Sequence, residues 1–175
     1  MPSGRSNGPP PSVSAPDCNV DDFALTVAER QLLRALDARG VRFLVVGLSA
    51  AVLEGAPVAT QAIDLWFEQI DERVAEAASE ARGFWISGFG VQPPAFGGPD
   101  LDRIDVVLTA HGLSDFMTEY KEAVVREVDG LPLRVLPLER IIASKRATSR
   151  PKDLAALPAQ EATLAARQRA DDPDA

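Results

Sequence analysis

Two aspartates lie in segments that are otherwise apolar. Asp64 follows the start of the run 62–67, and Asp105 lies inside Ile104-Asp105-Val106-Val107. Burying a carboxylate without a partner is costly, so an aspartate in an apolar strand needs a reason. For Asp64 the alternative is a residue that caps a turn at the strand edge. With one cysteine and one histidine, the chain favours oxygen ligands and therefore Mg²⁺ or Mn²⁺ at any metal site.

A glycine junction precedes the first of these aspartates. The apolar run 41–46 ends at Gly47, and a short helix is expected over 47–53. Glycine lets backbone N–H groups approach a phosphate closely, as they do at helix N-termini. We expect Gly47 and Ser49 to contact phosphates. The simpler alternatives are a strand-to-helix turn for Gly47 and an ordinary position in the first helical turn for Ser49.

Basic residues gather near the end of the chain. They are Arg140, Lys145, Arg146, Arg150 and Lys152, opposed only by Glu139 and Asp153. Such a segment is either a solvated helix face or a surface that binds phosphate or RNA. The single histidine, His111, is expected on a polar surface loop.

Hydrophobic periodicity predicts the elements that must position these residues. Helices are expected from a capping box at Thr26 to Gly40, over 47–53, 72–81 and 114–120, and from 138 to 169, with breaks near 149–151 and at Pro158. Strands are expected over 41–46, 62–67, 84–87 and 101–108. A hairpin is expected around Asp129-Gly130, with strands 124–127 and 131–135. The run 88–99, rich in glycine and proline, is expected to be a loop without regular pairing. The order predicts a mixed α/β, or α+β, domain with one small mixed sheet flanked by helices and a C-terminal helical segment.

The chain divides into one folded region and two tails. Residues 1–21, which include Cys18, are rich in proline, serine and glycine and are expected to be disordered, as is the acidic tail 170–175. Residues 22–169 form a single domain, and no signal peptide or membrane span is expected, which predicts a cytoplasmic protein. The net charge of −8 argues against general nucleic-acid binding by bulk charge.

These segments together resemble a known family. The runs FLVVGLSAAVLEG (43–55) and ATQAIDLWF (59–67) resemble the strand, glycine, helix and Asp-x-Asp strand of nucleotidyltransferases with the DNA polymerase β-like fold. The likeness is to the minimal bacterial enzymes grouped with abortive-infection toxins. Asp105 matches the third carboxylate. Lys145 and the run Ser149-Arg150-Pro151-Lys152-Asp153 resemble the Lys…Arg-Pro-x-Asp segment.

The resemblance implies a function and partners. It implies transfer of a nucleotide monophosphate from an NTP to an RNA (tRNA) or protein hydroxyl, with a cognate antitoxin as a genetic partner. Asp64 and Asp105 would hold Mg²⁺ or Mn²⁺. Gly47 and Ser49 would meet the phosphates, Lys145 and Lys152 would neutralise the triphosphate, and Arg150 and Asp153 would be further substrate-binding residues. Carboxylates two residues apart on a strand share a face, which is how the motif directs both at one pocket.

The chain departs from this pattern where metal binding is most sensitive. Ala62 stands at the first Asp of Asp-x-Asp, Leu48 at the second small residue of the glycine motif, and Val58 at a basic position. Glu68 lies too far along the strand to replace the missing carboxylate, while Glu54 is a nearer candidate. We therefore expect weak or absent transfer. The alternative is a catalytically inactive nucleotide- or partner-binding module of the same fold, and a weaker one is a structural partner whose cleft is unused.

Overall fold

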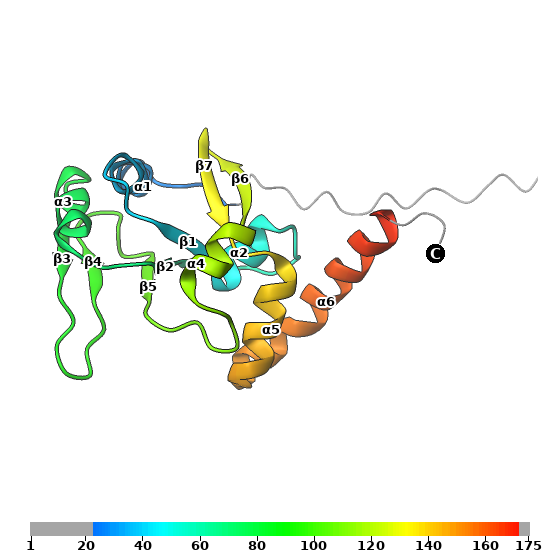
Figure 1. Ribbon diagram of the computed structural model, residues 1–175. Helices are drawn as coiled ribbons and strands as arrows, with labels where there is room; N and C mark the ends of the chain where they lie inside the picture. The colour runs from blue at the N-terminus through cyan, green and yellow to red at the C-terminus, as the bar shows by residue number, and fades with distance from the viewer. Residues whose placement is uncertain (1–22, 172–175) are drawn as a thin grey trace, which may run out of the picture.

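The computed structural model describes residues 23–171. The predicted tail 1–21, with Cys18, lies outside the described residues, as do residues 172–175 of the acidic tail; Ala170 and Asp171 belong to the last helix. The described residues form six helices and seven strands (Figure 1). The helices are α1 (Val27–Ala38), α2 (Gly47–Leu53), α3 (Glu72–Glu80), α4 (Phe116–Glu122), α5 (Leu138–Thr148) and α6 (Pro151–Asp171). The strands are β1 (Phe43–Val46), β2 (Ile63–Phe67), β3 (Phe84–Ile86), β4 (Ala95–Gly97), β5 (Ile104–Val107), β6 (Val124–Val128) and β7 (Leu131–Val135).

Five of the strands form one mixed sheet in the order β5-β2-β1-β7-β6. β2 runs antiparallel to β1 and parallel to β5, and β7 runs parallel to β1. β6 and β7 form the antiparallel hairpin predicted around Asp129 and Gly130. The mixed α+β architecture expected from the sequence is therefore confirmed.

The two faces of the sheet bury different aromatic clusters. On one face, Phe67 of β2 packs against Phe43 of β1 and Phe96 of β4. On the other face, Trp66 meets Phe116 of α4 edge to face, with ring centroids 5.2 Å apart. Side chains alternate along a strand, so Asp64 lies on the same face as Trp66. That face is the one on which α4 packs.

The first helix and the end of α5 follow from local signals. Thr26 and Glu29 form the predicted capping box of α1, in which the side chain of each residue accepts a hydrogen bond from the backbone N–H of the other. α5 ends at Ser149, whose left-handed φ of 50° turns the chain into α6. Consequently α5 and α6 pack side by side, at the lower right of Figure 1.

Three expectations about secondary structure are wrong. Residues 95–97 form β4, because Phe96 packs on Trp85 and Phe67 and this burial outweighs the glycine- and proline-rich composition. Pro158 lies inside α6 without breaking it; its ring is exposed, and the loss of one hydrogen bond is tolerated in a 21-residue helix. α4 is capped by Asp115 rather than Ser114, since the Asp115 carboxylate accepts the Thr118 N–H at 3.1 Å.

No helix within residues 23–171 combines the length and apolarity that a membrane crossing requires.

Candidate active site

Asp64 and Asp105 are direct neighbours in the sheet. Parallel pairing of β2 with β5 places Asp64 opposite Asp105, and both side chains line one cavity. Residues that are paired in register on adjacent strands project from the same face, so the two carboxylates converge. The predicted arrangement of these two aspartates in one cavity is confirmed.

Gly47 packs directly against the Asp64 carboxylate. Its φ is +64°, a left-handed conformation that favours glycine. A Cβ at this position would overlap Asp64 Oδ2 and lie 2.8 Å from Asp64 Cγ. Glycine is therefore required here twice, by its backbone conformation and by the space that Asp64 occupies.

Ser49 holds the backbone of Asp64 through a hydrogen bond. It is fully buried; its Oγ accepts the Asp64 backbone N–H at 3.1 Å and donates to the Val46 carbonyl at 2.8 Å. The hydroxyl also lies 3.4 Å from Asp64 Oδ2. The expectation that Ser49 meets a phosphate does not fit this geometry, because Ser49 does not line the cavity. Ser49 instead positions Asp64.

Within residues 23–171, no basic side chain forms an ion pair with the Asp64 carboxyl, and Lys145 acts on it only at longer range. Burial raises its pKa, and the neighbouring Asp105 raises it further, while Ser49 and Lys145 act in the opposite direction without cancelling the effect. A site that raises the pKa of a carboxyl in this way is one that a bound cation would stabilise in the ionised form.

The opposite wall of the cavity is a preformed charge network between α5 and α6. Lys145, only 7% exposed, donates from Nζ to Asp153 Oδ1 at 3.1 Å. Asp153 Oδ2 accepts from Arg150 Nε at 2.7 Å and from Thr148 Oγ1 at 3.0 Å. Burial of Asp153 raises its pKa, but the hydrogen bonds from Lys145, Arg150 and Thr148 outweigh this and hold it below the ordinary value. Asp153 thus holds Lys145 and Arg150 in position at the cavity that it also lines.

The cavity between these walls has a volume of about 340 Å³. Of the residues predicted for the site, it brings together Gly47, Asp64, Asp105, Lys145, Arg150, Lys152 and Asp153, and leaves out Ser49. Two aspartates lie on the sheet, and three basic side chains lie on the α5–α6 side, where Lys145 and Arg150 are both paired with Asp153. This arrangement suits an anionic ligand that carries a cation with it.

No further carboxylate completes the acidic wall. Ala62 lines the cavity two residues before Asp64, where its methyl group offers no ligand. The expectation that Glu54 lies nearer is wrong: Glu54 is buried and paired with Arg167 at 2.7 Å and Arg126 at 2.8 Å, outside the cavity lining. Glu68 is held by Arg42 at 2.6 Å. Within residues 23–171, no cluster of three His, Cys, Asp or Glu residues is placed to hold a metal ion.

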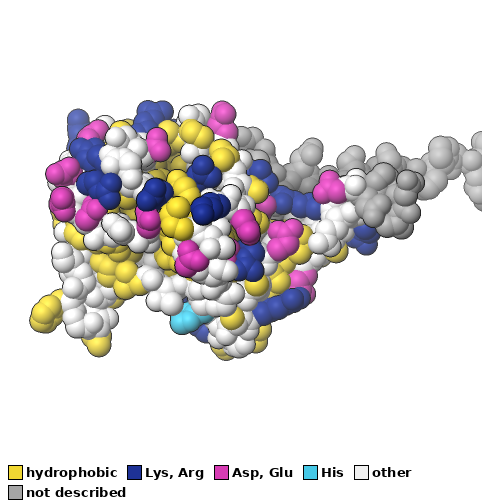
Figure 2. Space-filling model, in the orientation of Figure 1, with side chains coloured by type: hydrophobic (Ala, Val, Ile, Leu, Met, Phe, Trp, Pro, Cys, Tyr) yellow, Lys and Arg dark blue, Asp and Glu magenta, His cyan; other side chains and the backbone are white. Residues whose placement is uncertain are grey.

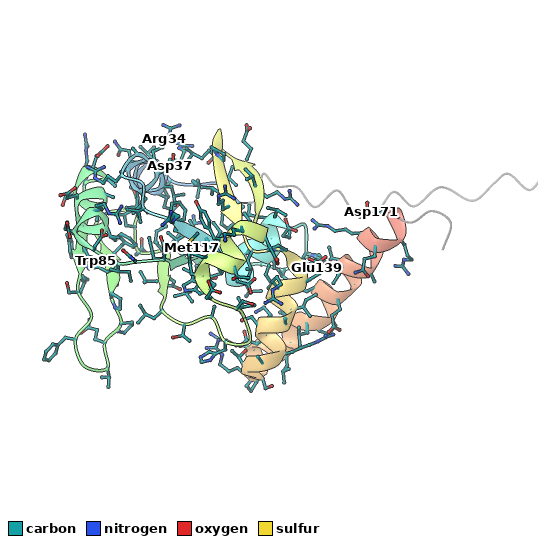
Figure 3. All side chains as sticks on the ribbon, in the orientation of Figure 1. Arg34, Asp37, Trp85, Met117, Glu139 and Asp171 are labelled. Atoms are coloured by element: carbon teal, nitrogen blue, oxygen red, sulfur yellow. The ribbon has the colours of Figure 1, made fainter. Side chains whose placement is uncertain are left out.

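A larger hollow of about 680 Å³ lies beside the β3–β4 hairpin. Its acidic residues are Asp71, which is paired with Arg73 at 2.6 Å, and Glu72, and its lining holds no basic side chain. The hairpin beside it carries exposed apolar side chains, among them Phe89 and Val91, and Figure 2 shows hydrophobic side chains projecting at the lower left. Figure 3 places Trp85, which lines this hollow, at the opposite end of the molecule from Asp171 of α6. We assign the site to the smaller cavity, because that one holds the paired carboxylates and the cations.

Sequence reasoning missed His111. The expectation of an ordinary surface loop is incomplete, because His111 is exposed but lines the same cavity as Asp64 and Asp105. A signal was present in Gly112, a glycine directly after the histidine that allows a turn at this point.

Comparison with solved structures identifies the fold. A solution structure of the antibiotic-resistance factor ANT(2'')-Ia matches with a TM-score of 0.53 and 17% identity over 80% of this chain and 84% of that one. A crystal structure of ANT(2'')-Ia in complex with adenylyl-2''-tobramycin matches with a TM-score of 0.51 and 17% identity, over 79% and 88% of the two chains. A search of protein-family models and of curated proteins gives no match. The chain therefore has the nucleotidyltransferase fold, as its sequence led us to expect.

Proposed function

We propose that this protein binds a nucleoside triphosphate with one Mg²⁺ or Mn²⁺ ion in the cavity between β2, β5 and the α5–α6 pair. The observation that carries the proposal is the register of Asp64 and Asp105, which places both carboxylates opposite a wall of basic side chains. The nucleotidyltransferase fold supports the same assignment. The reaction of this cavity is transfer of a nucleotide monophosphate to a hydroxyl, at a rate that the missing carboxylate makes low or negligible.

The residues present fit one metal ion better than two. Asp64 and Asp105 offer carboxylate oxygens, the ligands that Mg²⁺ prefers, and a single Mg²⁺ is commonly bound by one or two carboxylates plus phosphates and water. When bound, the ion neutralises phosphate charge and polarises the reacting phosphoryl group. Ala62 removes the ligand that a second ion would need. A two-metal mechanism therefore does not fit this chain.

The chain's own residues then bind and orient the nucleotide. Lys145, Arg150 and Lys152 neutralise the triphosphate, and Asp153 fixes the first two of these in place. Gly47 keeps the backbone close to the Asp64 carboxylate, and Ser49 fixes the backbone of Asp64. This positioning is the main contribution that a protein makes to phosphoryl transfer.

The acceptor and partners follow from the family that the sequence resembles. We propose an RNA (tRNA) or protein hydroxyl as acceptor, a cognate antitoxin as partner and the cytoplasm as location. The second candidate function, favoured by Ala62, is that of a pseudoenzyme that binds nucleotide or a protein partner without transfer.

Nucleotide binding and transfer by the Ala62→Asp variant test the proposal. We expect the natural chain to bind ATP in Mg²⁺ by calorimetry, Asp64→Ala to lose about tenfold or more in affinity, and Ala62→Asp to gain Mg²⁺ affinity. Labelled NTP incorporation into tRNA or protein should rise in Ala62→Asp. Lys121→Gln, an exposed change outside the cavity, is the control.

The outcomes separate the two functions. Nucleotide binding without transfer by either form supports the pseudoenzyme. Vigorous transfer by the natural chain, abolished by Asp64→Ala, overturns the expectation of weak activity. Absence of nucleotide binding in both forms overturns the proposal itself.

A further inference from the structure

The loop between β5 and α4 forms part of the cavity wall. His111 lies in this loop, and Thr109, Ala110 and Leu113 from the same loop also line the cavity. In Figure 1 the chain leaves β5, runs across to the lower end of α5 and only then returns to α4. The loop therefore carries His111 from the acidic strands toward the basic helices, and its other ionisable residue, Asp115, caps α4.

Gly112 fixes this loop on the surface of α5. Its φ is +71°, and a Cβ there would overlap the Ala147 side chain and lie 3.3 Å from the Ala143 carbonyl oxygen and 3.7 Å from Ser144 Cα. Contact this close requires glycine and leaves the loop backbone against the helix. Ser144 and Ala147 flank Lys145 in sequence on either side, so the residue before Gly112 is held close to the turn of α5 that carries Lys145.

A second contact holds the far end of the loop. The Ser114 N–H donates to Glu119 Oε1 at 2.8 Å, and Glu119 Oε2 accepts from Arg140 Nε of α5 at 2.9 Å. Glu119 is 1% exposed, and its hydrogen bond to Arg140 holds its pKa below the ordinary value. The loop thus contacts α5 directly at Gly112 and through Glu119 at Ser114. These contacts fix its position as one wall of the cavity.

The charges facing His111 differ between the elements around it. β2 and β5 contribute Asp64 and Asp105, which the proposed metal ion neutralises. α5, α6 and the turn between them contribute Lys145, Arg150, Lys152 and Asp153, and Asp153 is already shared between two of the cations. His111 lines the same cavity as these basic side chains, within reach of an anion bound there.

We propose that His111 is a nucleotide-binding residue that contacts the triphosphate. This inference rests on the proposed function and assigns it a further residue. The imidazole of His111 adds an N–H donor to the cationic donors of Lys145, Arg150 and Lys152 that line the same cavity, and so increases affinity for the polyphosphate.

The test compares the natural chain with His111→Gln and Lys121→Gln in excess Mg²⁺. Each variant removes one basic group, but Lys121 is exposed on α4 and does not line the cavity. Calorimetry with ATP, AMP and tripolyphosphate measures affinity. We expect His111→Gln to weaken ATP and tripolyphosphate binding about tenfold, with AMP binding and the Lys121→Gln variant unaffected.

The chain contains one histidine, so a tag-free sample gives a single imidazole signal by NMR. Tripolyphosphate should shift that signal, because the phosphate contacts the ring. If ATP binds to the natural chain but His111→Gln binds it equally well, the inference is overturned and the proposed function stands. Equal losses for AMP and tripolyphosphate overturn the triphosphate contact. Tripolyphosphate binding without ATP binding overturns the proposed function and supports the anion contact at His111.

Discussion

The two walls of the cavity differ in how their charged side chains are paired: the basic wall is formed by α5 and α6, and the acidic wall by Asp64 and Asp105. On the α5–α6 side, Lys145 and Asp153 form a closed network in which each has a partner within 3.1 Å. On the strand side, Asp64 and Asp105 face each other, and the Asp64 carboxyl has only a distant hydroxyl beside it. In the part of the chain that the structure describes, Lys145 and Asp153 of the basic wall are paired with each other, whereas the two aspartates of the acidic wall form no ion pair.

The pKa shifts of the two walls express the same difference. Asp153 has its pKa lowered, because the hydrogen bonds that it accepts outweigh the effect of burial. Asp64 has its pKa raised, because burial and the like charge of Asp105 prevail. Unfavourable electrostatic interactions between the carboxylates of one wall are typical of a ligand-binding site. Here the ligand that would relieve them is a cation.

Removing Asp153 is the change from which we expect the largest effect. Asp153→Ala leaves the buried Lys145 ammonium without a partner and should lower the free energy of unfolding by about 3 kcal/mol. Urea denaturation of the purified chain measures the loss. Asp153→Asn is the matched control, since it keeps an acceptor for Lys145 and should cost less. A loss below about 1 kcal/mol for Asp153→Ala would show that the basic wall is not a cooperative network.

Gly47 tests how tightly the acidic wall is built. Gly47→Ala introduces a methyl group at a φ of +64°, in the space that Asp64 occupies. Gly40→Ala is the matched control, with a φ of +65° and nothing within 4 Å of its Cβ. We expect about 1 kcal/mol from the left-handed backbone at Gly40 and about 1–2 kcal/mol more at Gly47. Equal losses would mean that Asp64 moves away from Gly47 without cost.

The same contrast explains what could be predicted from sequence. Asp64 and Asp105 were predictable, because strand periodicity and an aspartate in an apolar run are local patterns. The β6–β7 hairpin was predictable from Asp129-Gly130 for the same reason. The fold class required only the order of these elements.

What could not be predicted depends on contacts between distant residues. The sequence suggested that Glu54 could reach the site, but Arg167, 113 positions away, binds its buried carboxylate outside the cavity lining. The sequence predicted that Ser49 contacts a phosphate. In the structure β2 packs on α2, and the Ser49 hydroxyl instead accepts the backbone N–H of Asp64. β4 forms in a glycine- and proline-rich segment because Phe96 finds an aromatic pocket. Tertiary packing of this kind leaves little trace in local composition.

The smallest expected effect is a stabilisation, and it comes from replacing Asp64 in the acidic wall. In Mg²⁺-free solution at pH 7, Asp64→Asn should raise the free energy of unfolding by about 1 kcal/mol, because it removes a charge whose burial is uncompensated. A carboxyl whose pKa is raised in the folded protein contributes stability that is present below its ordinary pKa and lost as pH rises through the folded value. The gain from Asp64→Asn should therefore be largest near neutral pH and disappear in acid.

Magnesium should reverse the order of the two proteins. Asp64 in the natural chain then has its counterion, and binding to the folded state raises stability in proportion to the logarithm of free Mg²⁺. Asp64→Asn loses a ligand and should gain little, so its advantage at pH 7 should vanish at millimolar Mg²⁺. Thermal unfolding at pH 4 and 7, with EDTA or Mg²⁺, makes all four comparisons. If Asp64→Asn is less stable than the natural chain in EDTA at pH 7, the Asp64 charge does not destabilise the metal-free protein. The proposed difference between the acidic wall and the α5–α6 network is then wrong.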